Sequence, residues 1–429
     1  MFCLPRSPGT IRTMITASEH LERVLASTGV LETEIVPLTE ARGRCLAESV
    51  LASVPVPPWT NSAMDGYAVR FEDVIAASEQ SPVTLRVTGD VAAGSDQDPR
   101  IGPLEAARIM TGAPLPTDAD TVIPQEMTDC GVDQVMVSSA PSLGTYVRHA
   151  GEDRKIDDLI VAAGTEIKPE TLAAVVSAGA FEVTVARQPR VVVISTGDEL
   201  VGPGAELARG QIPDSNALLV SLLAEDAGAV TTTDSAGDTD GELESTINRH
   251  LEECDLIVMT GGVSVGAHEP VKALFDGTDA VRFDRVSMQP GKPQAFGRIG
   301  ETGPLVFGLP GNPISAWVSF QMFVRPCLRK LQGFLSLLPD LVPAQATEGW
   351  KTPQGRMQVI PVRIRDGRQR TVSPAATGGS GSHLVASLAD ADGYALVPTE
   401  IEQVRVGDLV ETVRLRDPEQ FIHEQRSST

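Results

Sequence analysis

The chain has 429 residues, a length typical of about three domains, and its 41% hydrophobic content can form several buried cores. Its formal net charge of −22 argues against a general nucleic-acid binder, because such proteins present a basic face to the phosphate backbone. The charge does not exclude an anionic small molecule, since helix N-termini and a few lysines can make one pocket locally positive.

The five cysteines are widely spaced and form no C-x-x-C pair, so the sequence predicts neither a disulfide framework nor a structural zinc site. We find no apolar run long enough to span a bilayer and no secretory signal, and we expect a cytoplasmic protein without a membrane partner. A capping box, Thr16 to Glu19, begins a helix just after Met14. The natural start therefore stays open between Met1 and Met14.

The first half of the chain indicates two regions. Residues 15–55 and 150–185 form a helical and linker domain, in which Pro169 begins a helix that ends near Gly179. Residues 56–149 contain short β-branched runs broken by Gly, Pro and Asp, which predict a small β module.

In residues 186–333 apolar strands alternate with helices, which predicts a doubly wound α/β sheet. Asp214 is expected to cap a helix. The apolar stripe predicted for that helix is Leu218, Leu219, Leu222 and Leu223. Residues 340–415 return to strands and predict a C-terminal β barrel.

Three sharp turns follow predicted parallel strands, at Ser195–Leu200, Gly261–Gly266 and Pro310–Ser315. Ligands of open α/β sheets bind outside those strand ends. Glycine lets backbone N–H groups approach a phosphate, and a following helix N-terminus adds positive potential. None of the turns is a Walker A loop or a G-x-G-x-x-G fingerprint, so triphosphatase and dehydrogenase functions are poorly supported.

Charged residues accompany these turns. Lys292 lies in QPGKP, where flanking prolines restrict the backbone and present the ammonium stiffly to an anion. Asp65 lies in the turn SAMDGYA, and Arg108–Pro114 and Gly151–Arg154 are similar small polar turns. Carboxylates that could supply oxygen ligands to Mg²⁺ are Asp198, Glu199, Asp214, Asp238 and Glu269.

Together, the segments SAMDGYAV, RIMTGAP, GED, STGDEL, GGVSVG, QPGKP, LPGNPISA and GSHL resemble, in order, the molybdopterin molybdenumtransferase family, MoeA, a module also found at the C-terminal end of gephyrin. The resemblance implies an elongated, four-domain protomer that works as a homodimer, with a MogA-like α/β domain. It implies an enzyme that takes adenylylated molybdopterin and molybdate, and releases AMP and molybdenum cofactor with help from Mg²⁺. A molybdopterin adenylyltransferase would be the upstream donor.

The resemblance also implies a site between the α/β domain of one subunit and the β module of the other. The catalytic residues it suggests are Asp65, Thr111, Asp153, Glu199 and Lys292. Those suggested for substrate binding are Ser195, Thr196, Gly197, Asp198, Asp238, Gly261, Gly262, Ser264, Arg285, Pro310, Asn312, Pro313, Ser315, Arg356 and Ser382. Glu199, Asp238 and Glu269 are its candidate Mg²⁺ ligands.

Two positions depart from the family pattern. Gln289 stands where many relatives carry a basic residue, and Arg285 is expected to supply the missing charge. Glu269 stands where relatives have Asp. The alternatives are a molybdopterin adenylyltransferase or related nucleotide pyrophosphatase, whose turn is typically TGG-T-G or TGG-L-G rather than TGGVSVG, and a scaffold built on this module. The metal, molybdenum or tungsten, stays open.

Overall fold

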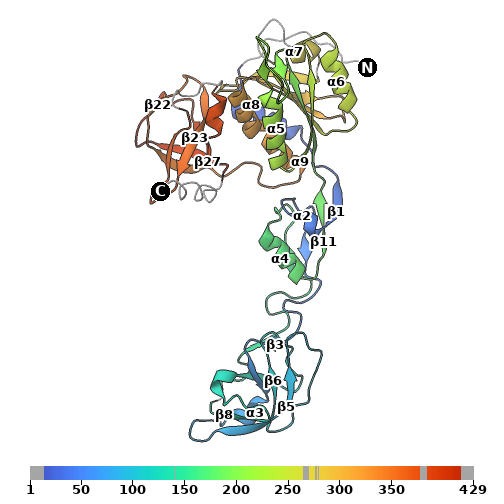
Figure 1. Cartoon of the computed structure of the whole chain (residues 1–429), viewed down its shortest axis with the longest axis vertical. Coiled ribbons are helices and arrows are strands. Elements are labelled where there is room, and N and C mark those ends of the chain that lie inside the picture. The colour runs from blue at the N-terminus through green and yellow to red at the C-terminus, as the bar shows by residue number, and fades with distance from the viewer. Residues whose placement is uncertain are drawn as a thin grey trace. The chain divides into compact units, whose positions relative to one another are not determined.

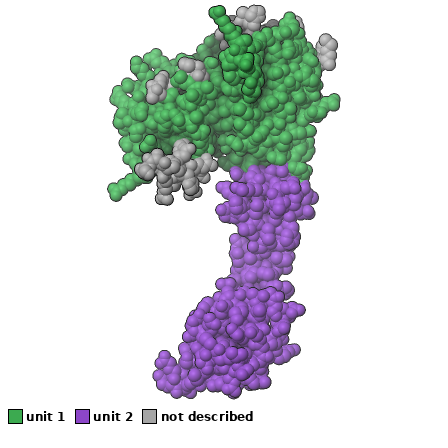
Figure 2. Space-filling view, in the orientation of Figure 1, with its two compact units in different colours: residues 1–34, 186–429 green, residues 35–185 purple. Residues whose placement is uncertain are grey.

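A computed structural model describes residues 14–139, 141–263, 270–275, 278, 280–376 and 384–416. The chain divides into two compact units, each described separately below (Figure 2). Unit 1 comprises Met1–Glu34 and Ala186–Thr429, and unit 2 comprises Ile35–Val185.

Unit 2 contains the predicted β module, a five-stranded sheet in the order β7-β4-β6-β5-β8 (Figure 1). Its strands are β4 (Gly66–Val69), β5 (Val83–Val91), β6 (Glu105–Ile109), β7 (Thr121–Pro124) and β8 (Gln134–Val137). Short elements beside them are β3 (Asn61–Ser62), β9 (Val147–Arg148), α3 (Phe71–Val74) and the 3-10 turn η1 (Gln125–Met127). Every residue of β4 is buried, because apolar clusters pack on both faces of this sheet.

The rest of unit 2 is built around α4 (Pro169–Ser177), with Pro169 in its first turn as predicted. The accompanying elements are β1 (Thr33–Pro37), α2 (Leu38–Ala41), β2 (Val50–Leu51), β10 (Leu159–Val161) and β11 (Glu182–Ala186). Strand β1 pairs with β11, and β2 pairs with β10. A separate small core that includes Leu46, Ile167 and Val175 holds these elements together.

The α/β part of unit 1 is a six-stranded sheet in the order β15-β12-β16-β20-β19-β17. The strands are β12 (Arg190–Thr196), β15 (Val230–Ala236), β16 (Leu256–Thr260), β17 (Val281–Arg285), β19 (Pro293–Arg298) and β20 (Leu305–Leu309). The first four strands in sheet order are parallel, which confirms the α/β prediction. Strand β19 runs antiparallel to both of its neighbours, β20 and β17, because short connections rather than helices join these strands.

Helices cover both faces of this sheet (Figure 1). Helices α5 (Ser215–Asp226) and α8 (Pro313–Ser319) pack on one face, together with α1 (Ala17–Ala26), the π-helical turn η2 (Phe320–Val324) and α9 (Arg325–Leu331). Helices α6 (Glu242–His250) and α7 (Pro270–Phe275) pack on the other. Alternate residues of β12 enter the two cores, Val191 and Val193 into one and Val192 and Ile194 into the other, so the strand is apolar without a break.

One prediction for α5 is wrong. Leu218 and Leu222 are 53% and 49% exposed, whereas Val220 and Ala224 are fully buried against the sheet. Leu219 and Leu223 pack only at the edge of the core. Because this helix is apolar around most of its circumference, periodicity alone does not select the face that packs.

Unit 1 ends in the predicted barrel, whose five strands close through the pairing of β23 with β25. Its strands are β21 (Val342–Ala346), β23 (Met357–Arg365), β24 (Thr371–Pro374), β25 (Gly393–Val397) and β27 (Leu409–Arg414), with β22 (Trp350–Lys351), β26 (Gln403–Val404) and the 3-10 turn η3 (Val385–Leu388) beside them. The barrel packs on the α/β part through Trp317 of α8, whose ring lies edge-on to Tyr394 at 5.9 Å. Strand β18 (Met288–Gln289), from the α/β segment, pairs with β23.

Two local predictions, the helix caps at Thr16 and Asp214, are confirmed. Thr16 and Glu19 form the capping box of α1, and the Asp214 side chain accepts a hydrogen bond from the Ala217 N–H in α5. The four cysteines within the described residues are all free thiols. Among those residues, none of the helices has the length and apolar character that crossing a membrane requires.

The central sheet generates a stability prediction. Phe307 on β20 is fully buried, and Phe307→Ala should lower the free energy of unfolding of the α/β part by about 3–5 kcal/mol through lost burial and a residual cavity. Leu335→Ala is the control in the same unit, because Leu335 is 81% exposed and its truncation should change stability by less than about 0.5 kcal/mol. Urea denaturation measures both, and equal midpoints for the two variants would contradict the packing described here.

Candidate functional site

The three predicted turns line one cavity of about 610 Å³ at the carboxyl ends of β12, β16 and β20. Thr196, Gly197 and Glu199 come from the first turn, Gly261 and Gly262 from the second. The third turn contributes Pro310, Gly311, Asn312, Pro313 and Ser315. The convergence expected from strand order is therefore present.

Direct backbone contacts hold the turns together. The Gly261 N–H donates to the Leu309 carbonyl at 3.0 Å, and the Thr196 hydroxyl donates to the Thr260 carbonyl at 3.3 Å. A Cβ on Gly311 would lie 3.5 Å from the Gly261 Cα, so any side chain at Gly311 would contact the second turn. Small residues thus leave the cavity lined by main chain and short polar side chains.

Asn216, which the sequence analysis did not single out as a site residue, joins α5 to the third turn. Its side-chain amide donates to the Gly311 carbonyl at 2.6 Å, and Asn216 itself lines the cavity. Ser215 and Asp214 also line the cavity, so the first turn of α5 contributes positive potential there. The sequence did carry one signal for Asn216: it follows the N-cap Asp214 by two residues, which places it in the first turn of α5.

Three of the predicted carboxylates, Glu199, Asp214 and Asp238, line this cavity. Gly197 has φ +140°, and the Glu199 carboxylate folds back over it in the space that a Cβ would occupy. The main chain of Glu199 accepts a hydrogen bond from Ile212 at 2.9 Å, where β13 (Leu200–Val201) and β14 (Ile212–Pro213) meet. The backbone of Asp238 is fixed by a hydrogen bond, in which its N–H donates to the Asp198 carboxylate at 3.0 Å.

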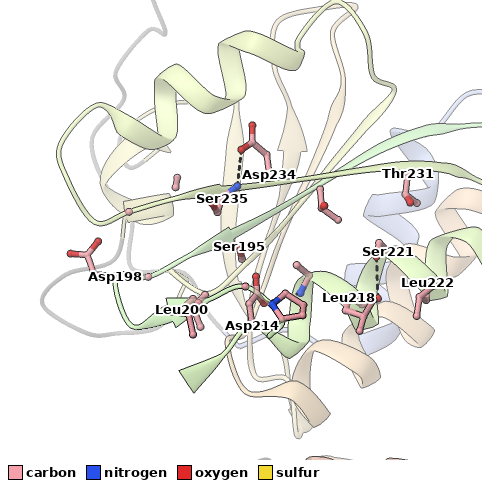
Figure 3. A pocket seen from close by; sticks show the side chains of 18 of the residues that line it. Ser195, Asp198, Leu200, Asp214, Leu218, Ser221, Leu222, Thr231, Asp234 and Ser235 are labelled. Atoms are coloured by element: carbon pink, nitrogen blue, oxygen red, sulfur yellow. Dashed lines mark hydrogen bonds between the residues drawn. The ribbon is translucent and has the colours of Figure 1, made fainter. Parts of the chain in front are cut away.

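Ser195 and Asp198 face a neighbouring cavity of about 810 Å³ between α5 and the edge strand β15 (Figure 3). Figure 3 shows the exposed Leu218 and Leu222 on α5 along the same cavity. The two cavities share Gly197, Leu200 and Asp214. The first turn therefore divides its side chains between them.

The Lys292 segment lies between the α/β part and the barrel. Lys292 is half-buried, and its carbonyl accepts a hydrogen bond from the Val286 N–H at 2.8 Å. Its neighbour Pro293 lines the 610 Å³ cavity and pairs with Arg285. Within the described ranges, no hydrogen bond or ion pair engages the Lys292 ammonium.

Arg285 and Arg356 are placed by strand pairing. Arg285 is exposed at the end of β17. Arg356 directly precedes Met357, whose N–H donates to the Ser287 carbonyl at 2.9 Å, so it lies beside the start of β18. The described residues that line the 610 Å³ cavity include neither arginine nor Lys292.

Helix α1 anchors the strand that leads to this segment. Asp284 on β17 accepts from Arg23 at 3.2 Å and shares a hydrogen bond with the buried His20 at 3.3 Å. Burial raises the pKa of Asp284, but the His20 hydrogen bond and the nearby positive charges outweigh it, so the pKa is lowered overall. The Ile15 N–H also donates to the Arg285 carbonyl at 3.0 Å.

A second group of predicted residues lies within unit 2. The Asp65 carboxylate accepts from the Thr111 N–H at 2.7 Å and from the Thr111 hydroxyl at 2.8 Å. These hydrogen bonds, the backbone one foremost, lower the pKa of Asp65. Asp153 lies in a separate turn, where its own N–H donates to the Val56 carbonyl. Its carboxylate forms an ion pair with the adjacent Arg154 at 2.9 Å. Asp65 and Thr111 thus form one hydrogen-bonded group.

Ser264, Glu269 and Ser382 lie outside the described residues. Among the residues that the structure describes, no three His, Cys, Asp or Glu side chains gather in an arrangement that could hold a metal ion. Of the three Mg²⁺ ligands that the family resemblance suggests, Glu199 and Asp238 line the cavity.

Comparison with known families agrees with this architecture. Profiles of the MoeA N-terminal region (domain I and II), a probable molybdopterin binding domain and the MoeA C-terminal region (domain IV) match residues 15–179, 192–330 and 343–415. Molybdopterin molybdenumtransferase 2 of Mycobacterium tuberculosis is 39% identical over 401 residues, covering 92% of this chain and 98% of the relative. The chain belongs to the MoeA family.

Other members of the MoeA family match over comparable lengths. The molybdopterin molybdenumtransferase of Haemophilus influenzae is 35% identical, covering 88% of this chain and 93% of the relative. The crystal structure of a molybdopterin biosynthesis MoeA protein from Pyrococcus horikoshii has a TM-score of 0.79 and 32% identity, covering 94% of this chain and all of that one. The fold and its order along the chain are those of the family.

The Asp65–Thr111 pair predicts a measurable titration. Thr111→Val removes the hydroxyl donor but retains the backbone N–H, so the pKa of Asp65 should rise part of the way to its ordinary value. In the wild type, the pair stabilises unit 2 above the ordinary carboxyl pKa, and this contribution is lost as the pH falls through the lowered pKa. Carboxyl-carbon NMR titration measures the shift. An unchanged pKa in the variant would contradict the hydroxyl's role.

Proposed function

We propose that the chain is a molybdopterin molybdenumtransferase, which inserts molybdenum from molybdate into adenylylated molybdopterin and releases AMP. The observation that carries this proposal is the convergence of three glycine-rich turns on one cavity. Full-length similarity to proteins named for this activity supports it.

The cavity suits the phosphate-bearing part of such a substrate. Gly261 and Gly262 have no side chain to block approach to their backbone, and the first turn of α5 is oriented with its positive end toward the same space. Thr196 and Ser315 line the cavity with short hydroxyl-bearing side chains. In this proposal Lys292, next to Pro293 on the wall, adds the positive charge that an oxoanion requires.

Glu199 and Asp238 fit a Mg²⁺ ion, because proteins commonly bind it through one or two carboxylates together with substrate phosphates and water. When bound, the ion would neutralise charge on the leaving phosphate. Glu199 would hold it from the first turn, and Asp238, positioned by Asp198, would hold it from the loop before α6. Glu269 is the third ligand in this proposal.

The Asp65–Thr111 group belongs to unit 2, whereas the 610 Å³ cavity is lined by residues of unit 1. We propose that the chain works as a homodimer, in which Asp65, Thr111 and Asp153 of one subunit complete the cavity of the other. In that arrangement the ionised Asp65 would orient the coordinating oxygen. We also propose a cytoplasmic location, four domains within the predicted boundaries, and a separate adenylyltransferase as the upstream donor.

The decisive experiment is molybdate-dependent release of AMP from adenylylated molybdopterin by the purified protein, with and without Mg²⁺. We expect release to require both molybdate and Mg²⁺, and Asp65→Asn and Glu199→Gln to abolish it without unfolding the protein. Tungstate in place of molybdate tests metal selectivity. Adenylylation of molybdopterin from ATP by this chain alone would instead identify an adenylyltransferase, and a protein that binds no pterin would indicate a scaffold.

Gly197 in the first turn and Gly202, just after β13, allow a specific effect on Glu199 to be separated from a general loosening of the backbone. In Gly197→Ala the new Cβ overlaps the Glu199 carboxylate at a φ that alanine rarely adopts, so the carboxylate must move. Gly202→Ala is the matched control, because a Cβ there meets no atom within 4 Å. We expect AMP release to fall at least about tenfold in the first variant, by loss of about 1.4 kcal/mol of transition-state stabilisation, and to persist in the second. Equal activities would remove Glu199 from the mechanism.

A further inference from the structure

A buried polar side chain links the Lys292 segment to the wall of the 610 Å³ cavity. Gln294, only 1% exposed, donates from its side-chain amide to the Gly291 carbonyl and to the Ser319 hydroxyl, each at 2.7 Å. Ser319 in turn donates to the Ser315 carbonyl at 2.7 Å. Ser315 lines the cavity, and Gly291 directly precedes Lys292.

The donors and acceptors available fix the direction of each hydrogen bond in this network. A carbonyl can only accept, so the group facing Gly291 must be the amide nitrogen of Gln294 rather than its oxygen. Because the Ser319 proton is used toward Ser315, its oxygen accepts the second amide proton. Both N–H groups of Gln294 are thereby occupied, and the network has one consistent arrangement.

The two donated bonds are the contribution that a glutamine makes at this position. Among the described residues, no group donates a hydrogen bond to the buried Gln294 Oε1 atom, so within them the amide acts through its nitrogen. An apolar side chain of similar size could fill the same space but could not donate either bond.

The network acts on a buried glycine turn next to Lys292. Gly291 has φ +95° and is buried against Ser319, and Lys292 is tied by its carbonyl to the Val286 N–H. Ser319 is the last residue of α8, where the helix passes into the π-helical turn η2. Gln294 therefore connects the backbone on one side of Lys292 to the helix that forms part of the cavity.

We infer that Gln294 is a positioning residue: through Gly291 it sets where the Lys292 ammonium stands relative to the cavity. This inference rests on the proposed function, in which Lys292 meets the anionic substrate. Gln294 itself is buried within the fold and is not among the residues that line the cavity, so its effect on catalysis must pass through the Lys292 segment.

The test uses Gln294→Met, which keeps a similar volume but removes both donors. We expect KM for molybdate or for adenylylated molybdopterin to rise about tenfold, as two lost hydrogen bonds would produce, with kcat changed by less than about threefold. Ser319→Ala keeps the bond to Gly291 and should raise KM by only about twofold to threefold. Thermal unfolding of both variants checks that the fold is retained.

A double-mutant cycle with Lys292→Met distinguishes positioning from general destabilisation. If Gln294 acts through Lys292, then Gln294→Met should raise KM no further once the ammonium has been removed. An unchanged KM in Gln294→Met, or a further tenfold rise in the double variant, would overturn the inference. If Lys292→Met alone leaves KM unchanged, the proposed role of Lys292 fails, and a wild type without AMP release refutes the proposed function itself. Should Gln294→Met fail to fold, a Ser319→Ala variant with unchanged KM contradicts the inference.

Discussion

The parallel pairing of β12, β16 and β20 is the constraint on which the rest of the site depends. Strands that run in the same direction end at the same edge of the sheet, so the residues that follow Thr196, Thr260 and Leu309 emerge side by side. Burial on both faces makes these strands continuously apolar, which leaves all the polar chemistry to the turns. Glycine and short hydroxyl residues then allow the turns to touch.

In a protein of net charge −22, a cavity that binds an anion must have positive charge or positive partial charge arranged around it. Backbone amides and the first turn of α5 supply fixed partial charges, which do not depend on the surrounding surface. Of the carboxylate residues in the cavity, Asp238 is positioned by a hydrogen bond from its N–H to the Asp198 carboxylate. Anion and divalent cation can therefore be accommodated together, which is the combination that the proposed reaction requires.

The predictable part of the protein is the part encoded by local pattern. Caps at Thr16 and Asp214, the alternation of strands and helices, the barrel and the convergence of the turns were all predicted and are all present. The buried face of α5 was not predicted correctly, because a helix that is apolar around most of its circumference carries little periodic signal, and Leu218 and Leu222 are exposed. Asn216 and Gln294 were missed because their partners, Gly311 and Ser319, are remote in sequence.

By itself, the sequence determined which segments become strands, helices and glycine turns, since propensity, capping and hydrophobic period act over a few residues. Its motifs also determined the family. Only the tertiary structure decided which turn side chains share a cavity, that Asp198 lines the neighbouring cavity while its carboxylate accepts from the Asp238 N–H, and which buried amide supports the Lys292 segment. These depend on hydrogen bonds and packing between segments far apart along the chain, whose geometry exists only once the sheet and its helices have assembled.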